Sequence, residues 1–284
     1  MRRGQWWCGL VVMVCASPSL RAMAPAFIEA TSERDDGKPA SSMWNAVDGN
    51  QGTIWCSQRS PAGKEALNFT FKEPVIVTHL ELVLPAKDGV TDTEHKRPRV
   101  VYVADAQHRV EARFKDVASE QRLELTPPAT GTRVVIEFED SWPARDADAP
   151  LCVAEVGLIV KGKRLTDGLG AKVRSLNTPA RRLLHQWHDD VSAPSRTLTF
   201  DVDGTFTYRF EDLLGEQKPV ALRGRWSATA GALTLETGGK TYRLQTRLTA
   251  IESAGRSTTL LTIAGSAPDP SLAADFTPAP LLLP

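Results

Sequence analysis

The sequence predicts an all-β protein with two units, an antiparallel jelly-roll β-sandwich and, after a short helix, a smaller β-meander of barrel-like shape. Short stretches of alternating apolar and polar residues recur from residue 66 to residue 160 and again from 196 to 263. Turns rich in Pro, Gly and Asp separate them, as in sandwiches and barrels. Between the two series, residues 179–191 have apolar positions spaced as on one face of a helix.

The first 24 residues have the pattern of a signal peptide. Arg2 and Arg3 precede an apolar run, residues 6–16, that is too short for a comfortable membrane span, and residues 22–24 read Ala-Met-Ala, a typical cleavage site. A lipoprotein signal would use Cys15, but a valine stands before it where a small residue is wanted. Charges interrupt every later apolar stretch, so no transmembrane segment is expected. We expect a secreted or periplasmic protein.

The charge of the chain is balanced, with 34 basic and 34 acidic residues. Cleavage after residue 24 would remove Arg2, Arg3 and Arg21 and no acid, which leaves 31 basic against 34 acidic residues. A mature charge of about −3 gives no electrostatic reason to expect nucleic acid or an anionic membrane as a partner.

The sandwich is expected to span residues 26–162. Glu73-Pro74 is expected to end the first of its strands, and the last strand carries Glu155. Two longer connections, residues 85–98 and 140–150, stand out, and long loops on a rigid sandwich are where binding usually occurs. The expected strands are 66–71, 75–84, 99–104, 108–114, 122–125, 132–138 and 152–160.

The second of these loops supplies the candidate ligand-binding residues, Trp142, Arg145, Asp146 and Asp148. An aromatic ring can stack on the apolar face of a sugar, and the charged groups can pair with its hydroxyls. The alternative is that Trp142 closes the end of the sandwich and the charged residues are simply solvated. The charged stretch 87–96 has the same two interpretations.

Residues 47–56 contain the most informative short motif, a tight Asp-Gly turn followed by Asn, Thr, Trp and Cys. Asp48, Asn50 and Thr53 can turn oxygen atoms toward one point, which suits either a hard cation or a turn that satisfies its own backbone. Trp55 is expected to begin a core strand.

Two cysteines, Cys56 and Cys152, remain after removal of the signal peptide. In an exported chain they most simply form one disulfide, and the alternative is two buried thiols. A bridge closing a loop of this length would stabilise the fold by roughly 4–5 kcal/mol in the chain-entropy model.

The second unit is expected to span residues 179–265, after a linker over 163–178. Thr178 is the expected N-cap of the helix, whose apolar stripe comprises Leu183, Leu184, Trp187 and Val191. A meander of five or six strands follows over residues 196–264, with hairpin turns at 201–204 and at Gly238-Gly239. The Pro/Ala-rich tail, 266–284, is expected to be disordered.

Three residues of this unit could carry chemistry. His185 and His188 are spaced i, i+3 on the expected helix and could share a metal ion, but a polar helix face explains both without one. Asp203 belongs to an Asp-x-Asp-Gly sequence that resembles the start of an EF-hand loop, although a hairpin turn fits it better. No nucleophile elbow, phosphate-binding glycine loop or paired-carboxylate arrangement stands out.

Residues 26–162 resemble a discoidin, or coagulation factor 5/8 type C, domain of the galactose-binding-like superfamily. The residues that carry the resemblance are the Asp-Gly turn and Thr-x-Trp of segment 45–55, and Cys152-Val153-Ala154-Glu155-Val156 in the last strand. Within that superfamily the chain is most similar to the NADase-type glycan-binding domain of some bacterial NAD glycohydrolase-like proteins, where cysteines equivalent to Cys56 and Cys152 recur together. Its loop 140–143 also matches an aromatic-Pro loop of that group.

This resemblance implies a non-catalytic domain that binds glycans or other surface ligands. It also implies a structural calcium ion, held by Asp48, Asn50, Thr53 and Glu155 together with backbone carbonyls, since calcium takes six to eight oxygens. The pattern of residues 198–206, followed by Gly224-Arg225-Trp226, is similar to lipocalin-like β-meanders of exported bacterial proteins and implies a barrel-like shape.

The sequence thus favours an exported, non-enzymatic binding protein that recognises a glycan or another cell-surface ligand through loops of the sandwich. The alternative is an accessory module or cryptic hydrolase with its chemistry in the second unit, at His185, His188 or Asp203. A purely structural envelope component is a third possibility.

Overall fold

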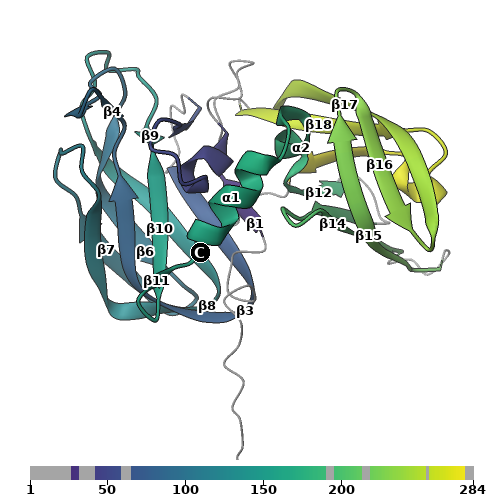
Figure 1. The fold of residues 1–284 in the computed structure, drawn as a ribbon, viewed down its shortest axis with the longest axis horizontal. Helices are drawn as coiled ribbons and strands as arrows, with labels where there is room; N and C mark the ends of the chain where they lie inside the picture. The colour runs from purple at the N-terminus through teal and green to yellow at the C-terminus, as the bar shows by residue number, and fades with distance from the viewer. Residues whose placement is uncertain are drawn as a thin grey trace, which may run out of the picture.

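The computed structural model describes residues 27–31, 42–58, 65–189, 195–212, 218–253 and 256–278. The predicted signal peptide lies outside these ranges. The all-β prediction is confirmed: a sandwich and a closed barrel stand side by side, with two short helices between them (Figure 1). The helices of the described residues are all too short or too polar to cross a membrane.

Two long antiparallel strands, β3 (Glu65–Val83) and β8 (Gln121–Trp142), form the centre of the sandwich. Each replaces two shorter predicted strands. The pairing of β3 with β8 is interrupted between Thr70 and Val75, where Pro74 lies exposed, so the chain bends there without ending the strand. The predicted break at Pro74 is therefore wrong.

The main sheet of the sandwich has the order β11-β10-β3-β8-β6-β7, with β1 paired to β3. Two further two-stranded sheets, β2–β9 and the hairpin β4–β5, complete the unit. The bounds of the remaining strands are β1 Phe27–Ala30, β2 Trp55–Cys56, β4 Ala86–Lys87, β5 Val90–Thr91, β6 Arg97–Ala104, β7 Arg109–Arg113, β9 Cys152–Val153, β10 Glu155–Val160 and β11 Lys163–Arg164.

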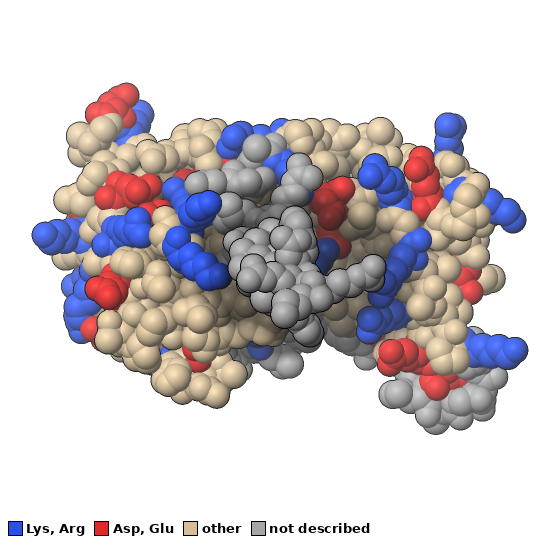
Figure 2. All heavy atoms as spheres, turned by 60° about the horizontal axis from the view of Figure 1, so that its bottom comes forward, with Lys and Arg blue, Asp and Glu red and all other residues tan. Residues whose placement is uncertain are grey.

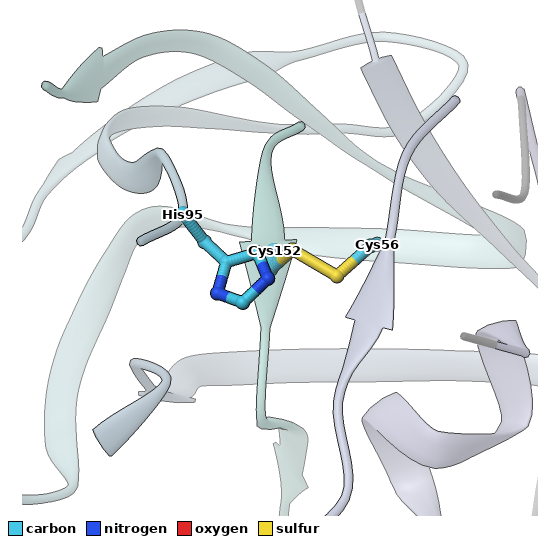
Figure 3. A group of neighbouring side chains, drawn as sticks. All are labelled: Cys56, His95 and Cys152. Atoms are coloured by element: carbon cyan, nitrogen blue, oxygen red, sulfur yellow. A yellow bond between two sulfur atoms is a disulfide. The ribbon is translucent and has the colours of Figure 1, made fainter. Parts of the chain in front are cut away.

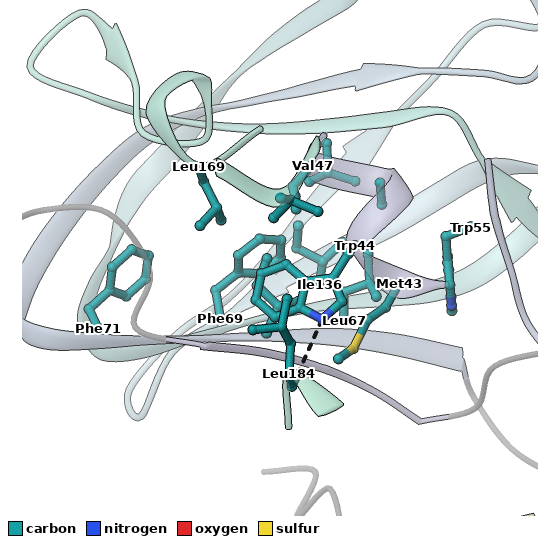
Figure 4. Packing of buried hydrophobic residues seen from close by; sticks show 14 of the residues in the cluster. Met43, Trp44, Val47, Trp55, Leu67, Phe69, Phe71, Ile136, Leu169 and Leu184 are labelled. Carbon is teal, nitrogen blue, oxygen red and sulfur yellow. Dashed lines mark hydrogen bonds between the residues drawn. The ribbon is translucent and has the colours of Figure 1, made fainter. Parts of the chain in front are cut away.

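The predicted linker, residues 163–178, instead holds β11 and helix α1 (Asp167–Ser175), and it packs against the sandwich. Leu169 and Val173 of α1 are buried in the apolar cluster that also contains Trp44 and Val47 of the 3-10 helix η3 (Met43–Val47) (Figure 4). This cluster continues without a break into the barrel, so both units share one core.

The predicted helix over 179–191 is shorter than expected. Helix α2 (Thr178–Leu183) has Asn177 as its N-cap, because the Asn177 side chain accepts a hydrogen bond from the Ala180 N–H at 2.8 Å. Trp187 lies on a strand, β12 (Gln186–Asp189), and not on the helix. Val191 lies outside the described residues. Leu183, Leu184 and Trp187 are buried as predicted, but from three different local conformations.

The second unit is a closed barrel of eight strands, β12 to β19. The hairpins at 201–204 and 238–239 are confirmed. The tail is not disordered over its described part. The strand β19 closes the barrel by pairing with β12 and β18, and the 3-10 helix η4 (Pro270–Leu272) precedes it; Leu272 and Phe276 are buried. The remaining strands are β13 Ser195–Phe200, β14 Thr205–Glu211, β15 Val220–Thr229, β16 Ala232–Thr237, β17 Lys240–Ser253, β18 Arg256–Ala264 and β19 Asp275–Pro278.

Large side chains fill the barrel. The rings of Phe200 and Trp226 lie 4.8 Å apart, and Phe206, Tyr208 and Phe276 are buried with them. The barrel interior is therefore a packed core at these residues and not a ligand cavity. On the face shown in Figure 2, basic and acidic side chains are interspersed over both units, in keeping with the balanced charge.

Candidate functional site

One buried arginine organises the predicted binding loops. Arg97, at the start of β6, is 2% exposed. Its guanidinium donates hydrogen bonds to the main-chain carbonyls of Asp92, His95 and Pro143 at 2.6–3.1 Å and to both carboxylate oxygens of Asp116. These bonds hold loop 92–96 against loop 143–150. Sequence analysis missed Arg97, because nothing in the local pattern separates a buried arginine from an exposed one.

Trp142 lies beside this arginine, as the last residue of β8 and the register partner of Arg97. Its ring is half-buried, and the Arg99 guanidinium carbon lies 5.3 Å from the ring centre. Arg99 is in turn ion-paired with Asp140. The indole Nε1 of Trp142 is buried and has no hydrogen-bond partner among the described residues.

The other predicted ligand-binding residues lie on the adjoining loop. The Arg145 side chain is 76% exposed and donates a hydrogen bond to Glu94 at 2.9 Å, so the pair bridges the two loops. The Asp146 carboxylate accepts the Asp148 N–H at 2.9 Å and thereby shapes its own turn, and both acids are exposed. The structure thus brings Trp142, Arg145 and Glu94 to one pair of loops, and it gives Asp146 a role within the turn.

The predicted disulfide is present between Cys56 of β2 and Cys152 of β9, which face each other across this two-stranded pair. Both residues are buried. The bridge lies next to the loops, because the Cys152 N–H donates to the carbonyl of Lys96 at 2.9 Å.

The oxygen-rich turn joins two distant segments, as the sequence predicts. Asp48 and Glu155 are 1% and 2% exposed, and the Asn50 N–H donates to a carboxylate oxygen of each, at 2.8 and 2.9 Å. The Thr53 hydroxyl also lies against Asp48. The Asn50 side-chain oxygen, in contrast, accepts the Gly52 N–H, so Asn50 presents its main-chain carbonyl to this cluster.

The donor chemistry of this turn fits a calcium ion. The Thr53 Oγ1 lies 2.7 Å from the Asn50 carbonyl oxygen and 2.9 and 3.0 Å from the two Asp48 oxygens. The hydroxyl has one proton, so it can donate a hydrogen bond to only one of these three oxygens. Oxygen–oxygen distances of this size are also those between neighbouring ligands of a calcium ion. Asp48, Thr53, Glu155 and the Asn50 carbonyl would hold the ion, whose chemistry there would be to fix the turn.

The buried carboxyl groups of the turn also suit a bound cation. Burial raises the pKa of Glu155 to about 7; the Arg164 guanidinium, 3.0 Å from its Oε2, opposes this rise, and the nearby Asp48 carboxyl adds to it. Burial and the nearby Asp48 carboxyl thus both disfavour the charged form of Glu155. A cation bound at the turn would favour that charged form.

Helix α1 packs directly on this turn. A Cβ on Gly170 would lie 2.6 Å from the carbonyl carbon and oxygen of Asp48, so only glycine allows this approach. Gly49, next to Asp48, has a φ of +71°, and the Arg174 guanidinium of α1 covers it. The segment that follows the sandwich therefore fixes the turn from outside.

Among the described residues, those considered for chemistry in the barrel form no group of three with the spacing of metal ligands. His185 follows α2, where burial lowers its pKa to about 4, while His188 lies on β12 opposite Thr197. Asp203 lies in the β13–β14 turn, about six residues beyond Thr197 and so on the order of 10 Å or more along the strand direction. Its carboxylate accepts the Thr205 N–H, as in a hairpin turn.

The sequence matches no protein-family model and no curated protein. Among solved structures, it is similar to the module CpGH89CBM32-5 of Clostridium perfringens, in complex with GalNAc-β-1,3-galactose, with 16% identity, a TM-score of 0.36 and coverage of 45% of this chain and 91% of that one. The family 32 module of NanJ from the same organism, in complex with galactose, has 15% identity and a TM-score of 0.34, and the match covers 48% of this chain and 93% of that one. An F5/8 type C domain from Bacteroides fragilis has 16% identity and a TM-score of 0.36, and the match covers 48% of this chain and 95% of that one.

The Bacteroides fragilis neighbour is described as an F5/8 type C domain, the family that the sequence of residues 26–162 resembles. At TM-scores below 0.5 these likenesses say nothing about function, and the sugars named in the descriptions belong to those proteins.

Proposed function

We propose that this protein is an exported, non-enzymatic binding protein that recognises a glycan or another cell-surface ligand through the loop end of its sandwich. We define this ligand surface as Glu94, Arg99, Trp142 and Arg145. A half-exposed aromatic ring beside exposed, hydrogen-bonding charged groups suits a sugar, which presents an apolar face and many hydroxyls.

The observation that carries this proposal is the network of Arg97. Its hydrogen bonds hold the carbonyls of Asp92, His95 and Pro143, so both loops under the ligand surface are fixed before a ligand arrives. A surface ordered in advance loses less conformational entropy on binding than a mobile one. The disulfide, which lies next to the same loop, adds to this order.

We further propose that calcium occupies the turn formed by Asp48, Thr53 and Glu155 as a structural ion. Its role would be to fix the junction of the turn with β10 and α1. The ligand surface lies on other loops, so loss of calcium should lower stability first.

The test is a glycan array probed with the mature chain, followed by calorimetric titration of the strongest ligand. We expect Trp142→Ala to weaken binding at least about tenfold, as loss of an aromatic anchor does, and Arg145→Ala to weaken it less. Arg223→Ala is the matched control, because Arg223 is an exposed arginine on β15 of the barrel. We expect mass spectrometry to recover the ligand intact.

An array without any bound glycan or cell-surface ligand would count against the proposal, as would unchanged affinity in both Trp142→Ala and Arg145→Ala. A cleaved ligand would contradict the non-enzymatic part.

A further inference from the structure

A second cluster of potential metal ligands surrounds the disulfide. One ligand atom each from Cys56, His95 and Cys152 lies within 4.8 Å of the other two (Figure 3). The two cysteines are buried, and the His95 side chain is 20% exposed. No other group of three or more His, Cys, Asp or Glu residues among the described residues meets this spacing.

The backbone fixes the histidine over the sulfur atoms. The strand that carries Cys152 runs beside residues 95–97, with a bridge between Lys96 and Leu151 and the Cys152 N–H bonded to the Lys96 carbonyl. In Figure 3 the imidazole extends from its loop toward Cys152. The position of His95 is held further by Arg97, which binds its main-chain carbonyl.

A carboxylate selects the tautomer of this histidine that suits metal binding. The Nδ1 of His95 lies 2.9 Å from the Asp92 carboxylate, which accepts a hydrogen bond from Nδ1–H and so keeps the proton on Nδ1. The Nε2 lone pair is then available. A histidine that binds a metal through one ring nitrogen usually donates a hydrogen bond from the other to a carboxylate, a main-chain carbonyl or water.

We propose that reduction of the Cys56–Cys152 disulfide turns this cluster into a Zn²⁺ site with two thiolates and one imidazole as ligands. A small dithiol would supply the reduction: it loses two electrons and two protons to become a cyclic disulfide, and Cys56 and Cys152 become thiols. Zn²⁺ binding then releases both thiol protons to solvent. Three protein ligands leave the fourth tetrahedral position to water, so the site would be open. Two thiolates favour Zn²⁺ over the hard cation suited to the Asp48 turn.

The site adjoins the loop that carries Glu94 of the ligand surface, but its test does not require a glycan. The mature chain is reduced with dithiothreitol, desalted under nitrogen and titrated with Zn²⁺ and, separately, with Co²⁺. We expect one ion per reduced chain and, with Co²⁺, the near-ultraviolet absorption of thiolate-to-cobalt charge transfer. The oxidised chain should show neither. Far-ultraviolet circular dichroism, recorded in parallel, follows the fold.

His95→Ala should weaken Zn²⁺ binding by the reduced chain at least about tenfold. His108→Ala is the matched control, because His108 also neighbours an aspartate three residues before it, Asp105, but belongs to no such cluster. Equal Zn²⁺ binding by the oxidised and reduced chains would overturn the proposal. So would unchanged affinity in His95→Ala, or a reduced chain that loses its β-sheet signal and does not regain it with Zn²⁺.

Discussion

Trp44 donates a hydrogen bond from its indole Nε1 to the main-chain carbonyl of Leu184, at 3.2 Å, and this buried bond joins the sandwich to the segment that enters the barrel (Figure 4). The two residues are 140 positions apart in the chain. Both are buried in the cluster that continues from one unit into the other.

Trp44→Phe removes this donor and leaves the Leu184 carbonyl buried without it. We expect the free energy of unfolding to fall by about 1–3 kcal/mol, the usual cost of a buried group left unpaired. Urea unfolding followed by circular dichroism measures it. Trp142→Phe is the control: the Trp142 Nε1 has no partner among the described residues, so its loss should cost much less. Equal effects of the two substitutions would contradict this account of the junction.

The raised pKa of Glu155 predicts a dependence of stability on pH. Its pKa is about 7 in the folded chain and near 4.5 when unfolded, so the folded state holds the proton more tightly. The stability from this group is fully present below about pH 4.5 and is lost as pH rises to about 7. By linkage, the loss is on the order of 3 kcal/mol. In a calcium-free buffer, the unfolding free energy of the wild type minus that of Glu155→Gln should fall across this window. A constant difference would refute the assignment.

Calcium should stabilise the protein, and more so at pH 8 than at pH 5.5, because a proton on Glu155 competes with the ion. At a free calcium concentration of 100 times the dissociation constant, the gain is about 2.7 kcal/mol. Thermal unfolding with calcium or with a chelator measures it. Asp48→Asn should lose most of the response, and Asp201→Asn, in the Asp-x-Asp-Gly hairpin, should keep it. A melting temperature insensitive to calcium at pH 8 would rule the site out.

Gly170→Ala tests the contact between α1 and the Asp48 turn. The added methyl would overlap the Asp48 carbonyl, so helix and turn must separate. Overpacking of this kind costs about 1–3 kcal/mol, and it should also weaken the calcium response. Lys172→Ala, an exposed position on the same helix, should change stability by less than about 0.5 kcal/mol. If both variants unfold at the same urea concentration, the close approach is not important for stability.

Local patterns predicted much of the fold. Alternation of apolar and polar residues located most strands, and the Gly238-Gly239 and 201–204 turns produced the expected hairpins. The Asp48–Glu155 relationship came from the resemblance to discoidin domains, and the disulfide from the two cysteines that remain after the expected cleavage.

The missed elements depend on contacts distant in sequence. The stretch Asp167–Ser175 contains two glycines, which disfavour a helix, yet one of them permits the approach to Asp48 that places α1. Trp187 has helical spacing from Leu183, but pairing with Leu198 and Pro278 makes β12 a strand. Within the candidate site, Arg97 acts through carbonyls from two loops, which no local pattern reveals.

The indole N–H signals of the tryptophans test the central claim most directly. In a chain labelled with ¹⁵N at the indole nitrogen, the strongest array ligand should shift the Trp142 signal, which Trp142→Phe assigns by its absence. The signals of Trp187 and Trp226 should stay in place, because their Nε1 atoms donate to the carbonyls of Leu183 and Asp201 away from the loops. A bound ligand that leaves the Trp142 signal unmoved and shifts that of Trp187 or Trp226 would contradict binding at the loop end of the sandwich.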